Sequence, residues 1–263
     1  MRVIAIDWSG AKRYAQKKIW LAEVAPRGEL LRLETGRTRD QVATHLIEEA
    51  SRGDRMVVGL DFAFSLPQWF MGERGFVAAP ALWAALADDG EADRWLAECE
   101  PPLWGLKAHP KPALAEHFRA TERRAGATAG IGCKSVFQVG GAGAVGTGSI
   151  RGMPVLHRLR EAGFAVWPFT APAPATLVEI YPRLLTGPVN KSREACRHAY
   201  LCEHFPTLNP ALRDLASSCE DAFDAAVSAL VMARHAVELR HLTHATDAQT
   251  QIEGAIWWPT EAA

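Results

Sequence analysis

The sequence predicts an α/β protein in which one sheet is covered by helices. Two observations lead to this prediction. Short apolar runs of strand length, such as Val3-Ile4-Ala5-Ile6 and Val57-Val58-Gly59-Leu60, alternate with longer stretches whose apolar residues recur at the period of a helix. The chain has 263 residues, 48% of them hydrophobic and 22% charged, which is enough for one substantial core. We therefore expect a single domain over 1–263.

The first sixty residues are predicted to form three strands, a helix and a fourth strand. The first strand covers residues 2–7, and a turn at Pro26-Arg27-Gly28 joins strands 18–24 and 29–34 into a hairpin. A helical pattern follows over 38–51, with Thr38 as its cap. The nearly all-apolar strand 56–61 is expected at the centre of a sheet that is covered on both faces.

The remainder divides into an irregular part and a regular part. The segment at about 65–146 is rich in aromatics and proline, and we interpret it as a helical and loop insertion after the fourth strand. Thr147 or Ser149 is expected to cap a helix that ends near Ala162. The later elements are predicted as strands 165–169 and 177–181, helices 192–204 and 219–238, and a short last element at Ile256-Trp257-Trp258-Pro259.

Composition limits the function classes. A formal net charge of −1 argues against a strongly basic protein that coats nucleic acid non-specifically. The five cysteines are an odd number without a repeated CxxC pattern, which favours reduced thiols in a cytosolic protein. No charged-then-apolar leader is evident, and no apolar run approaches the roughly 18 residues of a membrane span. We expect a cytoplasmic protein without a membrane partner.

Acidic residues at the ends of apolar runs are the main functional signal. The candidates are Asp7, Asp61, Glu179, Asp221 and Asp224. A charge in such a place is costly unless it is paired or binds a metal. Each acid alone also has a structural interpretation, because Asp7 and Asp61 suit turns and Ser218-x-x-Asp221 resembles a capping box. Together they predict a site for two Mg²⁺ or Mn²⁺ ions, since carboxylates from separate elements can hold such a pair.

The order of these motifs resembles a known family. Four segments carry the resemblance: Val3-Ile4-Ala5-Ile6-Asp7-Trp8-Ser9-Gly10, Val58-Gly59-Leu60-Asp61, Val178-Glu179-Ile180-Tyr181-Pro182 and Asp221-Ala222-Phe223-Asp224-Ala225. They are similar to the family called domain of unknown function 429, which is regarded as predicted RNase H-like nucleases. The closing Glu253-Gly254-Ala255-Ile256-Trp257-Trp258-Pro259 also resembles its C-terminal pattern.

The resemblance implies a ribonuclease H-like fold, which is a mixed five-stranded sheet flanked by helices, with the second strand antiparallel to the rest. In that fold Asp7 would be the central metal ligand, and Asp61, Asp221 and Asp224 would complete the metal site. Glu179 would support the metal ligands or face the substrate in preference to binding a metal ion itself. The two strands predicted after Gly163 exceed the one that the fold requires.

Substrate contacts are expected beside these acids. Gly141-Ala142-Gly143-Ala144-Val145-Gly146 satisfies GxGxxG after an apolar run at 136–139 and before a helix, the outline of a dinucleotide-binding loop. No acid for a ribose follows, so a loop whose amides meet a phosphate is favoured instead. Ser9, Lys134 and Arg151 are the candidate substrate-binding residues. The cluster Arg119, Arg123 and Arg124 suggests either contacts to a nucleic-acid backbone or a solvated helix face.

The leading hypothesis is a divalent-metal-dependent nuclease that hydrolyses phosphodiester bonds of DNA or RNA. Two alternatives stay open. One is a nucleotide-binding phosphotransferase or ATPase of the actin-like type, although those proteins need two copies of such a fold. The other is a non-catalytic module that binds nucleic acid or protein. Zinc binding by Cys196-x-His198 and Cys202-x-His204 is disfavoured, because the four side chains do not share one helix face.

Overall fold

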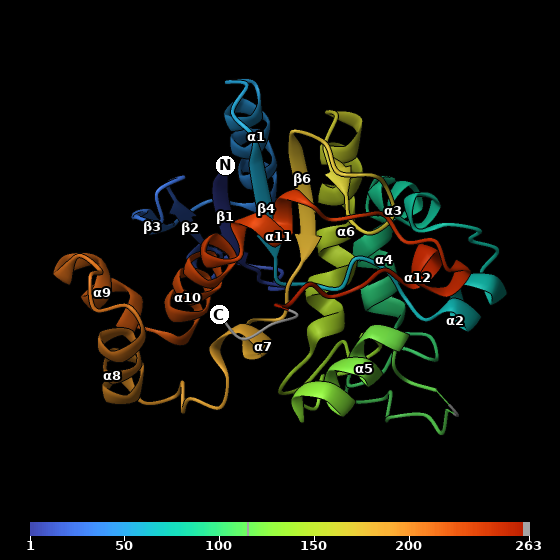
Figure 1. Ribbon diagram of the computed structural model, residues 1–263. Helices are drawn as coiled ribbons and strands as arrows, with labels where there is room; N and C mark the ends of the chain where they lie inside the picture. The colour runs from blue at the N-terminus through green and yellow to red at the C-terminus, as the bar shows by residue number, and fades with distance from the viewer. Residues whose placement is uncertain (115, 260–263) are drawn as a thin grey trace.

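The protein is built on one mixed sheet of six strands in the order β3-β2-β1-β4-β6-β5 (Figure 1). This computed structural model describes residues 1–114 and 116–259. The α/β class is therefore confirmed. The strands are β1 (Arg2–Asp7), β2 (Trp20–Val24), β3 (Leu30–Thr35), β4 (Met56–Leu60), β5 (Ala165–Val166) and β6 (Ala175–Glu179).

Strand directions divide the sheet into two parts. β2 runs antiparallel to both β1 and β3, as the predicted hairpin requires. β1, β4, β6 and β5 all run parallel to one another. β4 is fully buried between β1 and β6, so its predicted central position is confirmed. Because parallel strands end at the same edge, the residues that follow β1, β4 and β6 lie together.

The expectation of five strands was wrong, because the sheet has a sixth, short strand at its edge. β5 has only two residues, which pair with Thr176 and Leu177 of β6. The predicted strand 165–169 is cut short because Pro168 has no amide hydrogen to donate to a neighbouring strand. The sixth strand thus extends the parallel edge of the sheet.

Two helices and part of the insertion cover one face of the sheet. α1 (Arg39–Ala50) and α6 (Val145–Glu161) pack against Ile4, Ile6, Val58 and Leu60. Thr38 caps α1 through a complete capping box with Gln41, as predicted. The predicted cap of α6 was wrong, since the helix begins at Val145. The Thr147 hydroxyl donates to the carbonyl of Val139 instead.

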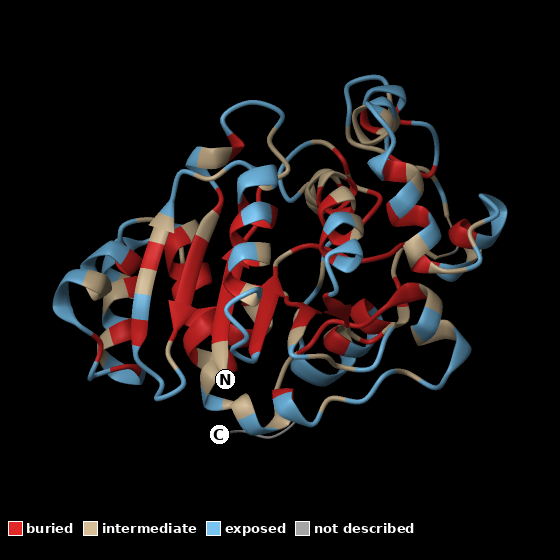
Figure 2. Cartoon of the chain, turned by 90° about the horizontal axis from the view of Figure 1, so that it is seen from above, coloured by how far each residue is buried: buried red, intermediate tan, exposed pale blue. Residues whose placement is uncertain are grey.

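The opposite face is covered mainly by α10 (Glu220–Arg234), which contacts β1 and β2. Small residues bring this helix close to the sheet: Ala222, Ala225, Ala226 and Ala229 are buried along it. A Cβ atom at Gly59 of β4 would lie 2.6 Å from the sulfur of Met232. Three further helices, α7 (Pro182–Thr186), α8 (Glu194–His204) and α9 (Pro210–Ser217), precede α10. Figure 2 shows buried strands between these two layers.

The segment between β4 and α6 consists of helices and loops. It contains α2 (Gln68–Glu73), α3 (Ala79–Ala87), α4 (Glu91–Glu98) and α5 (Ala120–Ala129), and α3 packs against α6. After α10 the chain forms α11 (Ala236–Arg240) and α12 (Ala248–Glu253). Ile256 then bridges to Glu179 at the end of β6, which confirms a last short pairing element. None of the described helices has the length and apolar character to cross a membrane.

Candidate functional site

The register of the parallel strands brings Asp7 and Asp61 side by side. Ile6 of β1 pairs with Leu60 of β4, and the amide of Asp61 donates to the carbonyl of Ile6 at 3.1 Å. The two acids are therefore the next residues along neighbouring strands. This arrangement follows from sequence position, because each acid ends an apolar run of a parallel strand.

Alternation along β1 decides which layer Asp7 faces. Val3 and Ala5 pack toward α10, whereas Ile4 and Ile6 pack toward α1 and α6. Asp7 continues the first series, so its carboxylate points to the α10 side. Asp224 is a buried residue of α10, and Asp221 lies one turn earlier at the start of that helix. The structure thus places four of the five predicted acids at the same edge of the sheet, on the side that α10 covers.

Burial, with repulsion between neighbours as a second cause, makes the charged form of these carboxylates unfavourable. Burial, and then the charges of Asp61, Asp224 and Asp221, raise the pKa of Asp7 well above its usual range. The pKa of Asp61 is likewise raised by burial first and then by Asp224. Burial raises the pKa of Asp224 to about 6, and burial also raises that of Asp221. A cation bound between them would relieve both the repulsion and the burial cost.

Lys191, in the loop between α7 and α8, forms an ion pair with one of these acids. Its Nζ lies 2.5 Å from Oδ2 of Asp224. The other oxygen of Asp224, Oδ1, is buried without a hydrogen-bond partner in the described part of the chain. In residues 1–114 and 116–259, no three His, Cys, Asp or Glu side chains are gathered closely enough to hold a metal ion. The donor set nevertheless fits Mg²⁺ or Mn²⁺, which prefer carboxylate oxygens.

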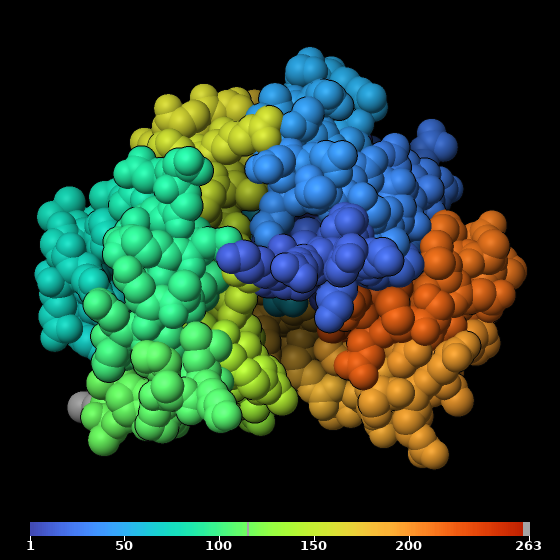
Figure 3. All heavy atoms as spheres, turned by 180° about the vertical axis from the view of Figure 1, so that it is seen from behind, coloured from blue at the N-terminus to red at the C-terminus, as the bar shows by residue number. Residues whose placement is uncertain are grey.

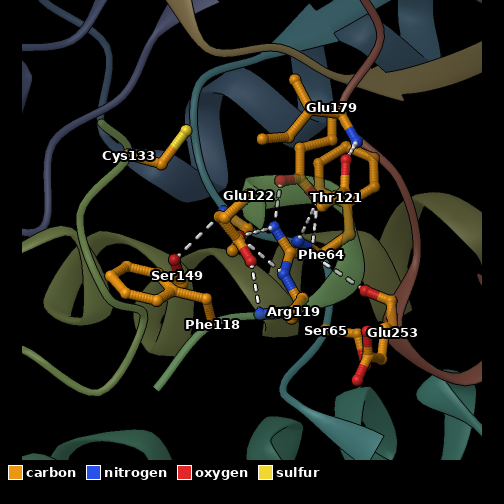
Figure 4. Close-up of polar contacts among 12 residues, drawn as sticks. Phe64, Ser65, Phe118, Arg119, Thr121, Glu122, Cys133, Ser149, Glu179 and Glu253 are labelled. Atoms are coloured by element: carbon orange, nitrogen blue, oxygen red, sulfur yellow. Dashed lines mark hydrogen bonds and ion pairs between the residues drawn. The ribbon is translucent and has the colours of Figure 1, made fainter. Parts of the chain in front are cut away.

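The side chain of Glu179 faces the layer that contains α6, and both of its carboxylate oxygens already accept hydrogen bonds. Leu177 packs toward α6 and Val178 toward α10, so Glu179 points back toward the α6 side. Its Oε2 accepts from the amide of Phe64 at 2.8 Å and from Arg119 Nη1 at 2.9 Å, and its Oε1 pairs with Arg119 Nη2 (Figure 4). Both oxygens therefore serve the scaffold, in keeping with the predicted supporting role.

Arg119 is the centre of this buried network. Its side chain has no exposed surface, and Glu122 accepts from its Nε at 2.8 Å. The carbonyl of Glu253 accepts from Arg119 Nη1 at 2.9 Å. The network joins the end of β6, the start of α5 and the end of α12. The interpretation of Arg119, Arg123 and Arg124 as one surface cluster was wrong, because Arg119 compensates buried carboxylates.

A cavity of about 290 Å³ adjoins Asp61, and the other three aspartates do not line it. Asp61, Trp8 and Tyr181 line it, together with Lys134 and the backbone at Gly143. The Lys134 side chain lies along this backbone, since a Cβ at Gly143 would be 3.2 Å from its Cε. The surface is hollowed where the loop after β1, the segment leading into α6 and the segments after β6 meet (Figure 3). Of the predicted substrate-binding residues, Lys134 thus lines the same cavity as Asp61.

The other two candidates, Arg151 and Ser9, make contacts that stabilise loops. Arg151 pairs with Asp93 at 2.8 Å, and its Nη1 donates to the carbonyl of Gly10. The Ser9 hydroxyl accepts from the amide of Ala11 at 3.2 Å. Neither residue lines the cavity of Asp61. Their role in substrate binding remains a prediction.

The glycine-rich segment has a packing role. Residues 136–139 form no strand of the described sheet, and only Gln138 makes an isolated bridge, to Trp104. A dinucleotide-binding βαβ unit is therefore not built here. A Cβ at Gly146 would lie 2.1 Å from the carbonyl oxygen of Val136, so glycine is needed where α6 begins.

Sequence reasoning missed Lys191, Glu122 and Glu253. Lys191 follows a Gly-Pro turn and resembles an ordinary surface lysine, and only the fold brings it to Asp224. Glu253 binds the amides of Gln68 and Ala120, at 2.8 and 2.7 Å, although it is distant from both in sequence. The only sequence feature that pointed to Glu253 was its position in the C-terminal motif Glu253-Gly254-Ala255-Ile256-Trp257-Trp258-Pro259.

Comparison with known proteins identifies no relative: no family model, no curated protein and no solved structure matches this chain.

Proposed function

We propose that this protein is a divalent-metal-dependent nuclease with a ribonuclease H-like fold. The observation that carries the proposal is the placement of Asp7, Asp61, Asp221 and Asp224 at one edge of the sheet beside α10, where burial first and then the charges of neighbouring aspartates raise the pKa of Asp7 and of Asp61. The strand order and the antiparallel second strand support the fold, with β5 as an addition at the edge. The chain's similarity to domain of unknown function 429 stands as part of this proposal.

The four aspartates are the residues that would hold two Mg²⁺ or Mn²⁺ ions. When bound, such ions activate a water molecule and offset the charge that develops on a leaving oxygen. Asp7 lies centrally in the cluster, between Asp61 of the next strand and Asp224 of the helix. Asp221 is half-buried at the helix start, on the solvent side of the cluster. Glu179 contributes by fixing Phe64 and Arg119 beneath Asp61.

The proposed substrate is a nucleic acid, either DNA or RNA. Hydrolysis adds water across a P–O bond of the backbone and leaves one hydroxyl and one phosphate monoester. The cavity beside Asp61 offers aromatic walls from Trp8 and Tyr181 and a cation from Lys134, which suits a nucleotide next to the reacting phosphate. The phosphotransferase alternative gains no comparable support, because the described residues form a single sheet with a single series of acids.

The experiment compares wild type with Asp7→Asn in two measurements. The first is thermal unfolding with and without saturating Mn²⁺, since a ligand that binds only the folded state raises the melting temperature. The second is hydrolysis of single-stranded, double-stranded and branched DNA and RNA. We expect Asp7→Asn to lose both the Mn²⁺ stabilisation and the hydrolysis.

Asp54→Asn is the matched control, because Asp54 is an exposed acid just before β4. It should retain both properties. Unchanged hydrolysis by Asp7→Asn would refute the proposed mechanism. Mn²⁺ stabilisation of wild type that persists in Asp7→Asn would place the metal elsewhere.

A further inference from the structure

Lys191 is held against the aspartate cluster by more than its own ion pair. The side chains of Lys191 and Asp224 are 17% and 12% exposed, so the pair is largely shielded from water. The ammonium of Lys191 thus pairs directly with one of the acids that the proposed function assigns to metal ions.

The backbone around Lys191 is fixed by two arginines. Arg183 Nη1 donates to the carbonyl of Val189 at 2.7 Å, and Arg197 Nη1 donates to the carbonyl of Lys191 itself. Arg197 is buried, and its Nε also donates to the carbonyl of Ser217 at 2.8 Å, just before α10. Burying an arginine is costly unless its hydrogen bonds are satisfied. The loop is therefore built to hold Lys191 in one place relative to α10.

An incidental surface pair would not need these supports. Exposed lysine–carboxylate pairs contribute little and have no buried anchor. Here the buried Oδ1 of Asp224 is left without a partner while Oδ2 binds Lys191. This pairing fits a cluster in which the lysine occupies the position of a cation.

We propose that Lys191 is the resident counter-charge of the aspartate cluster and that a divalent ion must displace its ammonium from Asp224 in order to bind. The inference rests on the proposed metal site. Its physical basis is competition: the flexible stem of lysine lets the ammonium leave while the anchored backbone stays. Since the ion must replace an existing ion pair, its affinity for the wild-type protein is lowered by the strength of that pair.

The first test measures Mn²⁺ binding by isothermal titration calorimetry at one fixed pH, using full-length protein. Lys191→Met removes the charge and keeps the apolar stem. We expect it to bind Mn²⁺ about tenfold more tightly than wild type or better, because no ammonium is displaced. Lys191→Arg keeps the charge and should not gain affinity. Lys107→Met, a change of an exposed lysine in the loop before α5, should match wild type.

The second test needs no metal. Melting temperatures are measured for Lys191→Met, Asp224→Asn and the double variant in metal-free buffer. Lys191→Met should lower the melting temperature in the wild-type background and change it little in the Asp224→Asn background. Equal effects in both backgrounds would contradict the counter-charge role.

The outcomes separate the two proposals. Mn²⁺ binding that depends on Asp7 but is unchanged or weaker in Lys191→Met would overturn the displacement by metal and leave the metal site intact. Equal tightening in Lys191→Arg and Lys191→Met would overturn it too, since charge would not be the cause. No Mn²⁺ binding by wild type, Lys191→Met or Lys191→Arg would refute the metal site and this inference together.

Discussion

Removing the Arg119 side chain should destabilise the protein severely. Arg119→Met leaves Glu122 and Glu179 without their charge partner, and the side chains of these two residues are only 4% and 3% exposed. Breaking a buried ion pair from one side costs about 3–5 kcal/mol. A domain has a total free energy of unfolding of about 5–15 kcal/mol, so a large part of the stability should be lost.

The assay is urea unfolding at pH 7, followed by the fluorescence of the nine tryptophans. Arg123→Met is the matched control on the same helix, because Arg123 pairs with Glu116 at a site where both side chains are about two-fifths exposed. That pair should contribute about 0–1 kcal/mol. A loss below about 1 kcal/mol for Arg119→Met would refute the reasoning from burial.

The pH dependence of this variant has a defined sign. Burial raises the pKa of Glu179 even in the wild type, where Arg119 opposes the rise. Without Arg119 the folded-state pKa should rise further above the unfolded value. Such a group takes up a proton on folding, so the destabilisation is largest at neutral pH and shrinks as the pH falls. Arg119→Met/Glu179→Gln should recover part of the lost stability at pH 7.

Three further predictions concern the acids and one close contact. Asp7→Asn should raise the metal-free free energy of unfolding at pH 7 by about 0.5–2 kcal/mol, since it removes a repelled buried charge, and urea unfolding that shows a loss would contradict this. Metal-free wild type should lose stability as the pH rises from about 4 to 6, measured by thermal unfolding, because the folded pKa of Asp224 is about 6 against a usual 3.8. Gly10→Ala should cost about 1–3 kcal/mol, because its Cβ would lie 2.4 Å from the amide nitrogen of Gly148, whereas Gly72→Ala, with open space around it, should be neutral or stabilising in the same urea assay.

The parts of the site that follow from local pattern were predictable from the sequence. Asp7 and Asp61 each end an apolar run, and parallel strands place such ends at one edge. Asp224 could be placed because its small neighbours indicate a helix that lies close to a sheet. The face of the sheet on which each acid lies depends on the alternation of side chains along the assembled strands. That Glu179 and Asp7 lie on opposite faces could therefore be known only from the register of β1, β4 and β6.

The parts that depend on long-range pairing were not predictable. Arg119 belongs to a run of basic residues that resembles a solvated surface, and its burial depends on Glu179, sixty positions away. The short strand β5 has two residues and exists because β6 offers a partner edge. Lys191 carries no local signal, since its role depends on how the loop before α8 is held against α10.

The hydrogen bond between Arg119 and the end of α12 has a consequence for how the protein is made. A ribosome releases β1 with Asp7 well before Asp224, and it releases Arg119 134 positions before the carbonyl of Glu253. Until then the nascent chain lacks the helix that brings Asp221 and Asp224 to the cluster, and Arg119 lacks one of its acceptors. On the proposed function, a growing chain beside messenger RNA would stay inactive until α10 had been translated.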